Sequence, residues 1–164
     1  MELIDGGEGL CNHVYVDNLV DAYILAAEND DLAGEGYIIS DGIGTSWRDF
    51  FGRYAQMAGA GPLPSISREQ AMLKAADQEA EARDRAPALT RTGVTLMTRK
   101  AVFRVDKARS ELGYVPRISL DEGMCLTEAW LREEGCLWQH CGVVKSPMRA
   151  SIADRGKGRA RQRT

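Results

Sequence analysis

The fold is decided by a stretch near the N-terminus that reads HVYVDNLVDAYILAA (residues 13–27). Its first four residues form a short, mostly apolar, β-favouring run, which predicts a strand. The next residue, Asp17, is typical of a helix N-cap, because its carboxylate can accept hydrogen bonds from the free N–H groups of a first turn. Helical spacing of the apolar residues then predicts a helix ending near Glu28. Its stripe is Leu19, Val20, Ala22, Tyr23, Ala26 and Ala27.

A second short strand is predicted over residues 37–40, after a glycine turn. Helices are predicted to follow up to residue 135, each marked by local start or stop signals such as a Ser with Asp, Glu or Gln three residues later. They cover residues 46–58, 67–83, 88–100, 106–112 and 119–135, and the pattern over 88–100 is the weakest. Gly113 closes the fourth of these helices. The last has a predicted buried stripe of Leu120, Met124, Thr127, Trp130 and Leu131.

This pattern predicts an α/β fold that is helix-rich and has few short strands. Two strands cannot form a stable parallel sheet alone. The sequence therefore indicates that part of the expected sheet is missing, and we find no internal repeat that would replace it.

The charge is distributed unevenly along the chain. The 164 residues have a net charge of −3, but residues 145–164 carry seven Lys or Arg and one Asp, a net +6. We therefore divide the chain into an ordered part, residues 1–135, and a basic tail, residues 136–164, which we expect to be disordered. No apolar run is long enough to span a bilayer and no leader pattern is present, so the expected location is cytoplasmic.

The four cysteines match no zinc or disulfide spacing. Cys136, His140 and Cys141 lie close in sequence, but neighbouring ligands without a second pair make a poor tetrahedral site. We therefore predict no metal site and expect reduced thiols.

Three segments, taken in order, resemble a known family. They are NHVYVDNLVDA (residues 12–22), GYIISDG (36–42) with Thr45-Ser46, and DKARSELGYVP (106–116) with SLDEG (119–123) and Trp130-Leu131. They are similar to the C-terminal half of NAD(P)-dependent epimerase/dehydratase proteins, the extended short-chain dehydrogenases/reductases, including the sterol-dehydrogenase-like branch. The resemblance covers residues 3–134 and implies a partial Rossmann-like fold. Each segment also has a plain folding role, so the match says more about fold than about chemistry.

The chemistry that this resemblance implies is incomplete in the chain. The family binds NAD or NADP on a Gly-rich loop between a strand and a helix, and no such loop is present. It also uses a Tyr with a Lys four residues later for proton transfer. The five Tyr of this chain are followed at that distance by Leu19, Ala27, Asp41, Ala58 and Ile118. We therefore predict a fragment of an oxidoreductase or isomerase that is inactive alone, without catalytic or cofactor-binding residues.

The substrate side of the family is what remains. Nucleotide-sugar members commonly carry an Arg where this chain has Cys11. The choice between a sugar-like and a sterol-like substrate, with a hydroxyl or keto group in either case, therefore stays open. The resemblance implies substrate contacts at Asn12, His13, Arg99 and Arg104, although His13 is equally consistent with a strand residue without a role.

Two rival functions stay open. The chain is either part of a longer enzyme, in which case the missing N-terminal nucleotide-binding half should dock on exposed apolar faces, or a non-catalytic binding or subunit-interaction module with a closed surface. A homodimer is compatible with both. Nucleic-acid binding by the tail is the weakest alternative, since the tail has no aromatic residue for base stacking.

Overall fold

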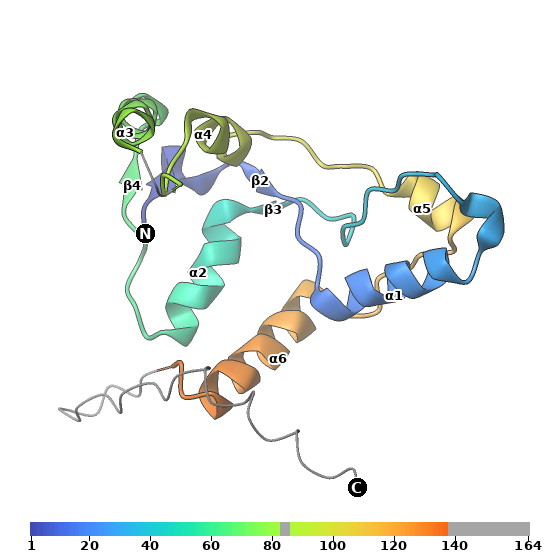
Figure 1. Ribbon diagram of the computed structural model, residues 1–164. Coiled ribbons are helices and arrows are strands. Elements are labelled where there is room, and N and C mark those ends of the chain that lie inside the picture. The colour runs from blue at the N-terminus through green and yellow to red at the C-terminus, as the bar shows by residue number, and fades with distance from the viewer. Residues whose placement is uncertain (83–85, 138–164) are drawn as a thin grey trace, which may run out of the picture.

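The computed structural model describes residues 1–82 and 86–137, and these form a helix-rich α/β chain with few short strands (Figure 1). The predicted fold class is therefore confirmed. The helices are α1 (Val16–Ala27), α2 (Trp47–Met57), α3 (Arg68–Glu81), α4 (Arg91–Met97), α5 (Asp106–Glu111) and α6 (Leu120–Glu133), with short 3-10 turns at Asp5–Gly7 and Asp30–Leu32. The strands are β1 (Leu3–Ile4), β2 (Leu10–Cys11), β3 (Thr45–Ser46) and β4 (Ser65–Ile66).

The strands pair in two separate small sheets. β1 lies parallel to β4, with Leu3 opposite Ser65, and β2 lies antiparallel to β3, with Cys11 opposite Thr45. Both predicted strands are wrong, because residues 13–15 and 37–40 form no ladder within the described part of the chain. Directly after the second segment, the Asp41 N–H donates a hydrogen bond to the His13 carbonyl oxygen, at 2.9 Å. A β-favouring sequence becomes a strand only when a neighbour satisfies its backbone groups.

The helix starts predicted from Ser residues are confirmed. Ser46, Ser67 and Ser119 are the N-caps of α2, α3 and α6, and each Ser hydroxyl accepts a hydrogen bond from the backbone N–H three residues later. Only at Ser67 is the full reciprocal capping box formed, with Gln70. The prediction for α1 is wrong in detail, because Tyr15 is its N-cap and Asp17 lies inside the first turn.

Helix ends follow the predicted stop signals. α5 ends before Gly113 and α6 before Gly135, and these glycines have φ of 69° and 67°. Only glycine adopts this left-handed conformation without steric cost. The weakest predicted helix is real but shorter, as α4. The predicted basic tail falls almost wholly outside the described residues, which end at Leu137.

Two apolar clusters hold the chain together at opposite ends of the molecule (Figure 1). One joins β1 to α3 and α4, where the buried side chains of Ile4, Ala71, Ala75 and Val94 meet. The other joins α1 to α5 and the segment after it, with Ala22, Ala108, Leu112 and Tyr114. The chain between them runs through the β2–β3 pair, beside which Gly9 packs so closely that a Cβ there would overlap the Met97 carbonyl.

Two predicted apolar stripes are only partly buried. On α6, Met124 is buried as expected, but Trp130 is 56% exposed. On α1 the buried side is formed by Asn18 and Ala22, whereas Val20 and Tyr23, placed in the predicted stripe, are exposed. Helical spacing identified an amphipathic helix but could not tell which apolar face the rest of this chain would cover.

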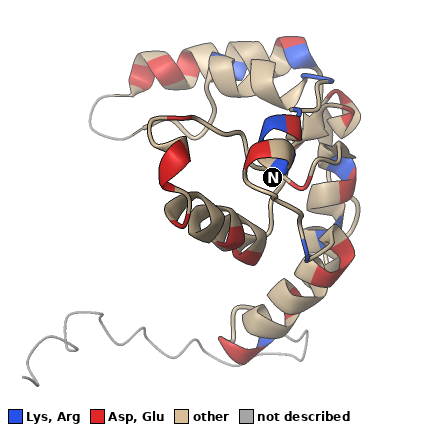
Figure 2. Cartoon of the chain, turned by 90° about the vertical axis from the view of Figure 1, so that its right-hand side faces the viewer, with Lys and Arg blue, Asp and Glu red and all other residues tan. Residues whose placement is uncertain are grey.

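Figure 2 shows acidic and basic residues on the same helices over much of the described chain, whereas the charged residues of α1 are all acidic. Exposed ion pairs such as Lys74 with Glu2 and Lys107 with Glu35 account for part of this mixture. Among the described residues, no helix combines the length and the apolar character needed to cross a membrane.

Candidate functional site

The predicted substrate residues lie where the two ends of the molecule are joined. Asn12 directly follows β2 and fastens the segment after α4 to it: its Nδ2 donates to the Ala101 carbonyl at 2.9 Å, and its Oδ1 accepts from the Phe103 N–H at 2.7 Å. The Leu10 N–H also donates to the Arg99 carbonyl, at 2.8 Å. Both polar atoms of the Asn12 amide are therefore engaged in hydrogen bonds that help to position residues 99–103.

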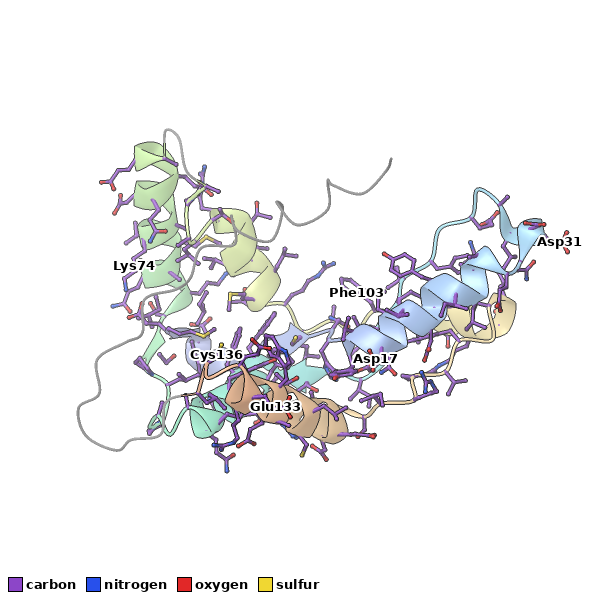
Figure 3. The ribbon with its side chains drawn as sticks, turned by 60° about the horizontal axis from the view of Figure 1, so that its bottom comes forward. Asp17, Asp31, Lys74, Phe103, Glu133 and Cys136 are labelled. Atoms are coloured by element: carbon purple, nitrogen blue, oxygen red, sulfur yellow. The ribbon has the colours of Figure 1, made fainter. Side chains whose placement is uncertain are left out.

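The two predicted arginines flank that fastened segment. The Arg99 guanidinium lies over the Phe103 ring, 5.7 Å from its centroid, and both side chains are exposed (Figure 3 labels Phe103). The Arg104 side chain is 87% exposed and its Nε donates to Asp106 at 2.6 Å. This ion pair, with the largest effect coming from the hydrogen bond, lowers the pKa of Asp106 below its ordinary value. The structure thus brings Asn12, Arg99 and Phe103 together, with Arg104 beside them at the surface.

His13 lies apart from this group and points into the interior. Its side chain is 5% exposed and its Nε2 lies 3.5 Å from Oδ2 of Asp41, which is 4% exposed. The His13 ring also contacts Phe50 of α2, with ring centroids 6.0 Å apart. Asn12 and His13 are adjacent in sequence but face different surroundings, so they do not form one site.

Asn18 holds the Asp41 carboxylate in place. From the first turns of α1, its Nδ2 donates to Asp41 Oδ1 at 2.9 Å and to the Ile118 carbonyl at 2.8 Å. Its Oδ1 accepts from the N–H groups of Arg117 and Ile118, each at 2.9 Å. The side chain is fully buried and its amide makes four hydrogen bonds, which join α1 to the Asp41 loop and to the segment before α6.

Asn18 and Asp41 were not among the residues predicted from the sequence. A signal was present for Asn18, because it lies four residues before Ala22 on one face of the helix, where an amide can be buried only if its partners are supplied. Nothing comparable marks Asp41, since an Asp-Gly pair ordinarily indicates an exposed turn.

A small pocket opens beside His13 and Asp41, between α2 and α6, with a volume of about 70 Å³. Aromatic and aliphatic side chains form its walls, and Ser119 and Thr127 are the lining residues with an aliphatic hydroxyl group. The lining is completed by Val14, Tyr15, Phe50, Tyr54, Leu120, Gly123 and Met124. No group of three or more His, Cys, Asp or Glu arranged for a metal ion occurs in residues 1–82 and 86–137.

Cys11 occupies the position where nucleotide-sugar relatives were expected to carry an Arg. It is buried in β2, and burial raises the pKa of its thiol to about 11. A buried, neutral thiol cannot supply the charge-assisted hydrogen bonds that an Arg makes to a phosphate group. Because the folded pKa lies above that of an unfolded cysteine, folding stability is expected to fall as the pH rises from about 8.5 towards 11.

We expect Cys11 to resist alkylation in the folded chain. Only the thiolate reacts, and at pH 8 a thiol with a pKa near 11 is about one thousandth ionised. Iodoacetamide at pH 8 should therefore modify the exposed Cys125 and Cys136 at least tenfold faster than Cys11, as followed by mass spectrometry of peptides. In guanidinium chloride the three should react at similar rates. Equal rates in the folded chain would show that Cys11 is not buried.

The chain is similar to known proteins in both sequence and fold. Over 127 residues the chain is 34% identical to the 4-hydroxy-2-methyl-3-oxo-4-farnesyl-3,4-dihydroquinoline-1-oxide ketoreductase of Stigmatella aurantiaca, a match that covers 74% of this chain and 37% of that protein. The fold of this chain is similar to that of the UDP-glucose 4-epimerase of Thermotoga maritima, solved with UDP-glucose. The TM-score is 0.51 and the identity 26%, and the match covers 81% of this chain and 35% of the epimerase. The chain is related to the NAD-dependent epimerase and ketoreductase superfamily.

A third relative supports the fold alone. The UDP-glucuronic acid 4-epimerase of Bacillus cereus, solved with UDP-glucuronic acid and NAD, matches with a TM-score of 0.52 at 16% identity, over 81% of this chain and 35% of that one. The partial Rossmann-like fold expected from the sequence is thereby confirmed. No family model matches the chain. The chain spans about two fifths of the length of the curated relatives that it matches.

Proposed function

We propose that the chain is the substrate-side part of an NAD(P)-dependent oxidoreductase of the epimerase/dehydratase type and acts together with a nucleotide-binding part. The observation that carries this proposal is the uncovered apolar face of α1. Val16, Val20, Tyr23 and Ile24 recur at helical spacing and are between 46% and 68% exposed. Figure 1 shows α1 at the edge of the molecule, where a further layer can pack against it.

The same face continues beyond α1. A groove of about 370 Å³ runs between α1 and residues 35–39, lined by Leu19, Tyr23, Tyr37 and Ile39 among others. Ile38, in the unpaired extended segment, is 55% exposed. An apolar helix face beside a strand-like segment without ladder partners is the surface that a sheet from another part of the protein would complete. A monomer with a closed surface would cover it, so this observation disfavours a stand-alone binding module.

In this proposal the substrate binds the chain at residues 99–103, the segment that Asn12 positions. The exposed guanidinium groups of Arg99 and Arg104 can bind an anionic or hydroxyl-bearing substituent, and the Phe103 ring offers an apolar surface beside them. Asn12 is a positioning residue. The buried, uncharged Cys11 favours a substrate without a nucleotide diphosphate, such as a hydroxyl- or keto-bearing sugar or sterol-like molecule.

The cofactor is assigned to the other part of the protein. NAD or NADP would supply hydride chemistry at a keto or hydroxyl group, and the chain lacks both the Gly-rich loop and the Tyr-x-x-x-Lys pair that would bind and use it. What this chain contributes is substrate binding and an apolar surface that excludes water at the junction. We therefore expect it to be inactive alone.

Cofactor titration tests the proposal directly. The purified 164-residue chain should show no saturable binding of NADH or NADPH at micromolar concentrations, measured by nucleotide fluorescence. A longer chain, extended by the coding sequence that lies upstream, should bind the nucleotide and carry an in-frame Gly-rich loop and Tyr-x-x-x-Lys. Micromolar binding by the 164 residues, or a stop codon directly upstream, would contradict this function.

A further inference from the structure

A second hollow between α2 and α6, separate from the small pocket beside His13, forms an open groove. Its volume of about 490 Å³ lies within the range of roughly 300–1,000 Å³ that is usual for binding clefts. Met57 of α2 and Met124 of α6 supply its apolar lining. The other lining residues are Arg53, Gln56, Asp121, Cys125 and Glu128.

The two helices that form the groove lie outside the apolar clusters of the fold. Among the described residues, neither α2 nor α6 contributes a side chain to the clusters around Ile4 and Tyr114. An ion pair between Arg53 and Asp121, at 2.5 Å, joins the helices at the groove, but the Asp121 side chain is 81% exposed. Such exposed ion pairs contribute little to stability. A segment packed into the groove would therefore add apolar contact where the fold has little.

The last described residues turn back along the side of α6 that carries Met124. Gly135 has φ of 67°, and the N–H groups of Cys136 and Leu137 both donate to the Leu131 carbonyl, at 2.8 and 3.3 Å. This turn ends the helix and keeps the following residues against its last turn. Leu131 lies seven positions after Met124 and so on the same side of α6. Figure 3 labels Cys136 at this end of the helix.

The length of chain that follows Leu137 is sufficient to fill the groove. Along α6, the ten positions from Leu131 back to Asp121 cover about 15 Å, at a rise of about 1.5 Å per residue. An extended chain covers roughly 3.3 Å per residue, so about five residues span that distance. Residues 138–145, which read WQHCGVVK, can therefore reach from one end of the groove to the other.

The chemistry of this segment matches that of the groove. Trp138, Val143 and Val144 are apolar, and methionine side chains pack favourably against aromatic rings. Lys145 brings a positive charge to a groove lined by two carboxylates and one guanidinium group. We propose that the groove between α2 and α6 binds residues 138–145 of the same chain and that this contact holds the two helices together. Disorder of the tail, expected from its composition, is the alternative that experiment must exclude.

Methionine methyl signals test the proposal on the full 164-residue chain. Of its six methionines, Met57 and Met124 line the groove, whereas Met72 and Met97 pack against the cluster that joins β1 to α3 and α4. An indole ring held in the groove displaces nearby methyl signals through its ring current. We expect Trp138→Leu to move the Met57 or Met124 signal in a ¹H–¹³C NMR spectrum and to leave those of Met72 and Met97 in place.

Two further variants separate the segment from the rest of the tail. Val143→Asn combined with Val144→Asn removes apolar contact and should move the same groove signals. Ile152→Asn is the matched control, because it makes a similar change in the tail beyond the segment and should move neither groove signal. These substitutions all lie outside the described helices, so helical circular dichroism should be unchanged and a loss of folding cannot imitate the result.

Disulfide trapping identifies what occupies the groove. Cys125 lines the groove and Cys141 belongs to the segment, and a Cys136→Ser variant removes the other exposed thiol of the described chain. The thiol of Cys11 is buried. Oxidised glutathione should join Cys125 to Cys141 within one chain about tenfold faster than it does in the double valine variant. Mass spectrometry of peptides identifies the bond.

Three results would overturn the proposal. The first is unchanged Met57 and Met124 signals in the Trp138→Leu and double valine variants, as expected for a disordered tail. The second is trapping at equal rates with and without the two valines. The third is a disulfide that links two chains in place of the internal one, which would assign the groove to a second copy. Nucleotide binding does not enter these readouts, so this inference and the proposed function can fail separately.

Discussion

Replacing Asn18 with Ala should lower the free energy of unfolding by about 3 kcal/mol. The change removes four hydrogen bonds at once and leaves the N–H groups of Arg117 and Ile118, the Ile118 carbonyl and the Asp41 carboxylate without their partner. Each buried group that loses its partner costs more than the net contribution of the bond itself. The measurement is urea unfolding followed by circular dichroism at 222 nm.

Two further variants show whether the amide is what matters at this position. Asn18→Asp keeps the acceptor oxygen but loses the donor and brings a second carboxylate against Asp41, so it should destabilise at least as strongly as Asn18→Ala. Asn29→Ala is the control, because Asn29 makes a single cap hydrogen bond to the Asp31 N–H in an exposed turn and should cost about 1 kcal/mol or less. A loss below 1 kcal/mol for Asn18→Ala would show that the four bonds are not formed together.

Lysine substitution on the exposed face of α1 should weaken docking of the nucleotide-binding part by about 30-fold or more. The variant combines Val20→Lys and Tyr23→Lys, which place two charges where the proposed function requires a dry apolar contact. Both positions are solvent-exposed in the described chain, so its own stability should change by less than about 0.5 kcal/mol. The readout is the dissociation constant of the two separately expressed parts.

The matched control is Leu73→Lys on α3, where the side chain is 64% exposed but lies far from α1 (Figure 1). It should leave docking unchanged. If the α1 variant docks as tightly as the parent chain, then α1 is not the contact surface. If it instead dissociates a dimer of the chain and no second part binds, the face serves self-association, which contradicts the proposed function.

Local chemistry made the helices predictable from the sequence. Ser46, Ser67 and Ser119 act through hydrogen bonds to residues three positions away, and Gly113 through its own backbone angle, so neighbouring residues contain the whole signal. The strands were not predictable in this way. The β-favouring residues 13–15 lack a ladder partner in the described chain, while the two-residue strands β1 and β4 pair over more than sixty positions of sequence without any local signature.

The candidate site shows the same division. Asn12 could be selected through the family resemblance, because it begins the first matching segment, but its partners at residues 101 and 103 could not. Asp41 becomes meaningful only once folding has placed it between His13 and Asn18. Exposed apolar faces were expected in kind, and on α1 the exposed side includes Val20 and Tyr23, which helical spacing had marked as buried.

The Asn18 amide also has a consequence for the order in which the chain can fold. Its bonds to Arg117 and Ile118 join residues 99 and 100 positions apart. Closing a loop of that size costs chain entropy before any contact compensates for it. During synthesis α1 leaves the ribosome about a hundred residues before the Asn18 amide can make all four of its hydrogen bonds.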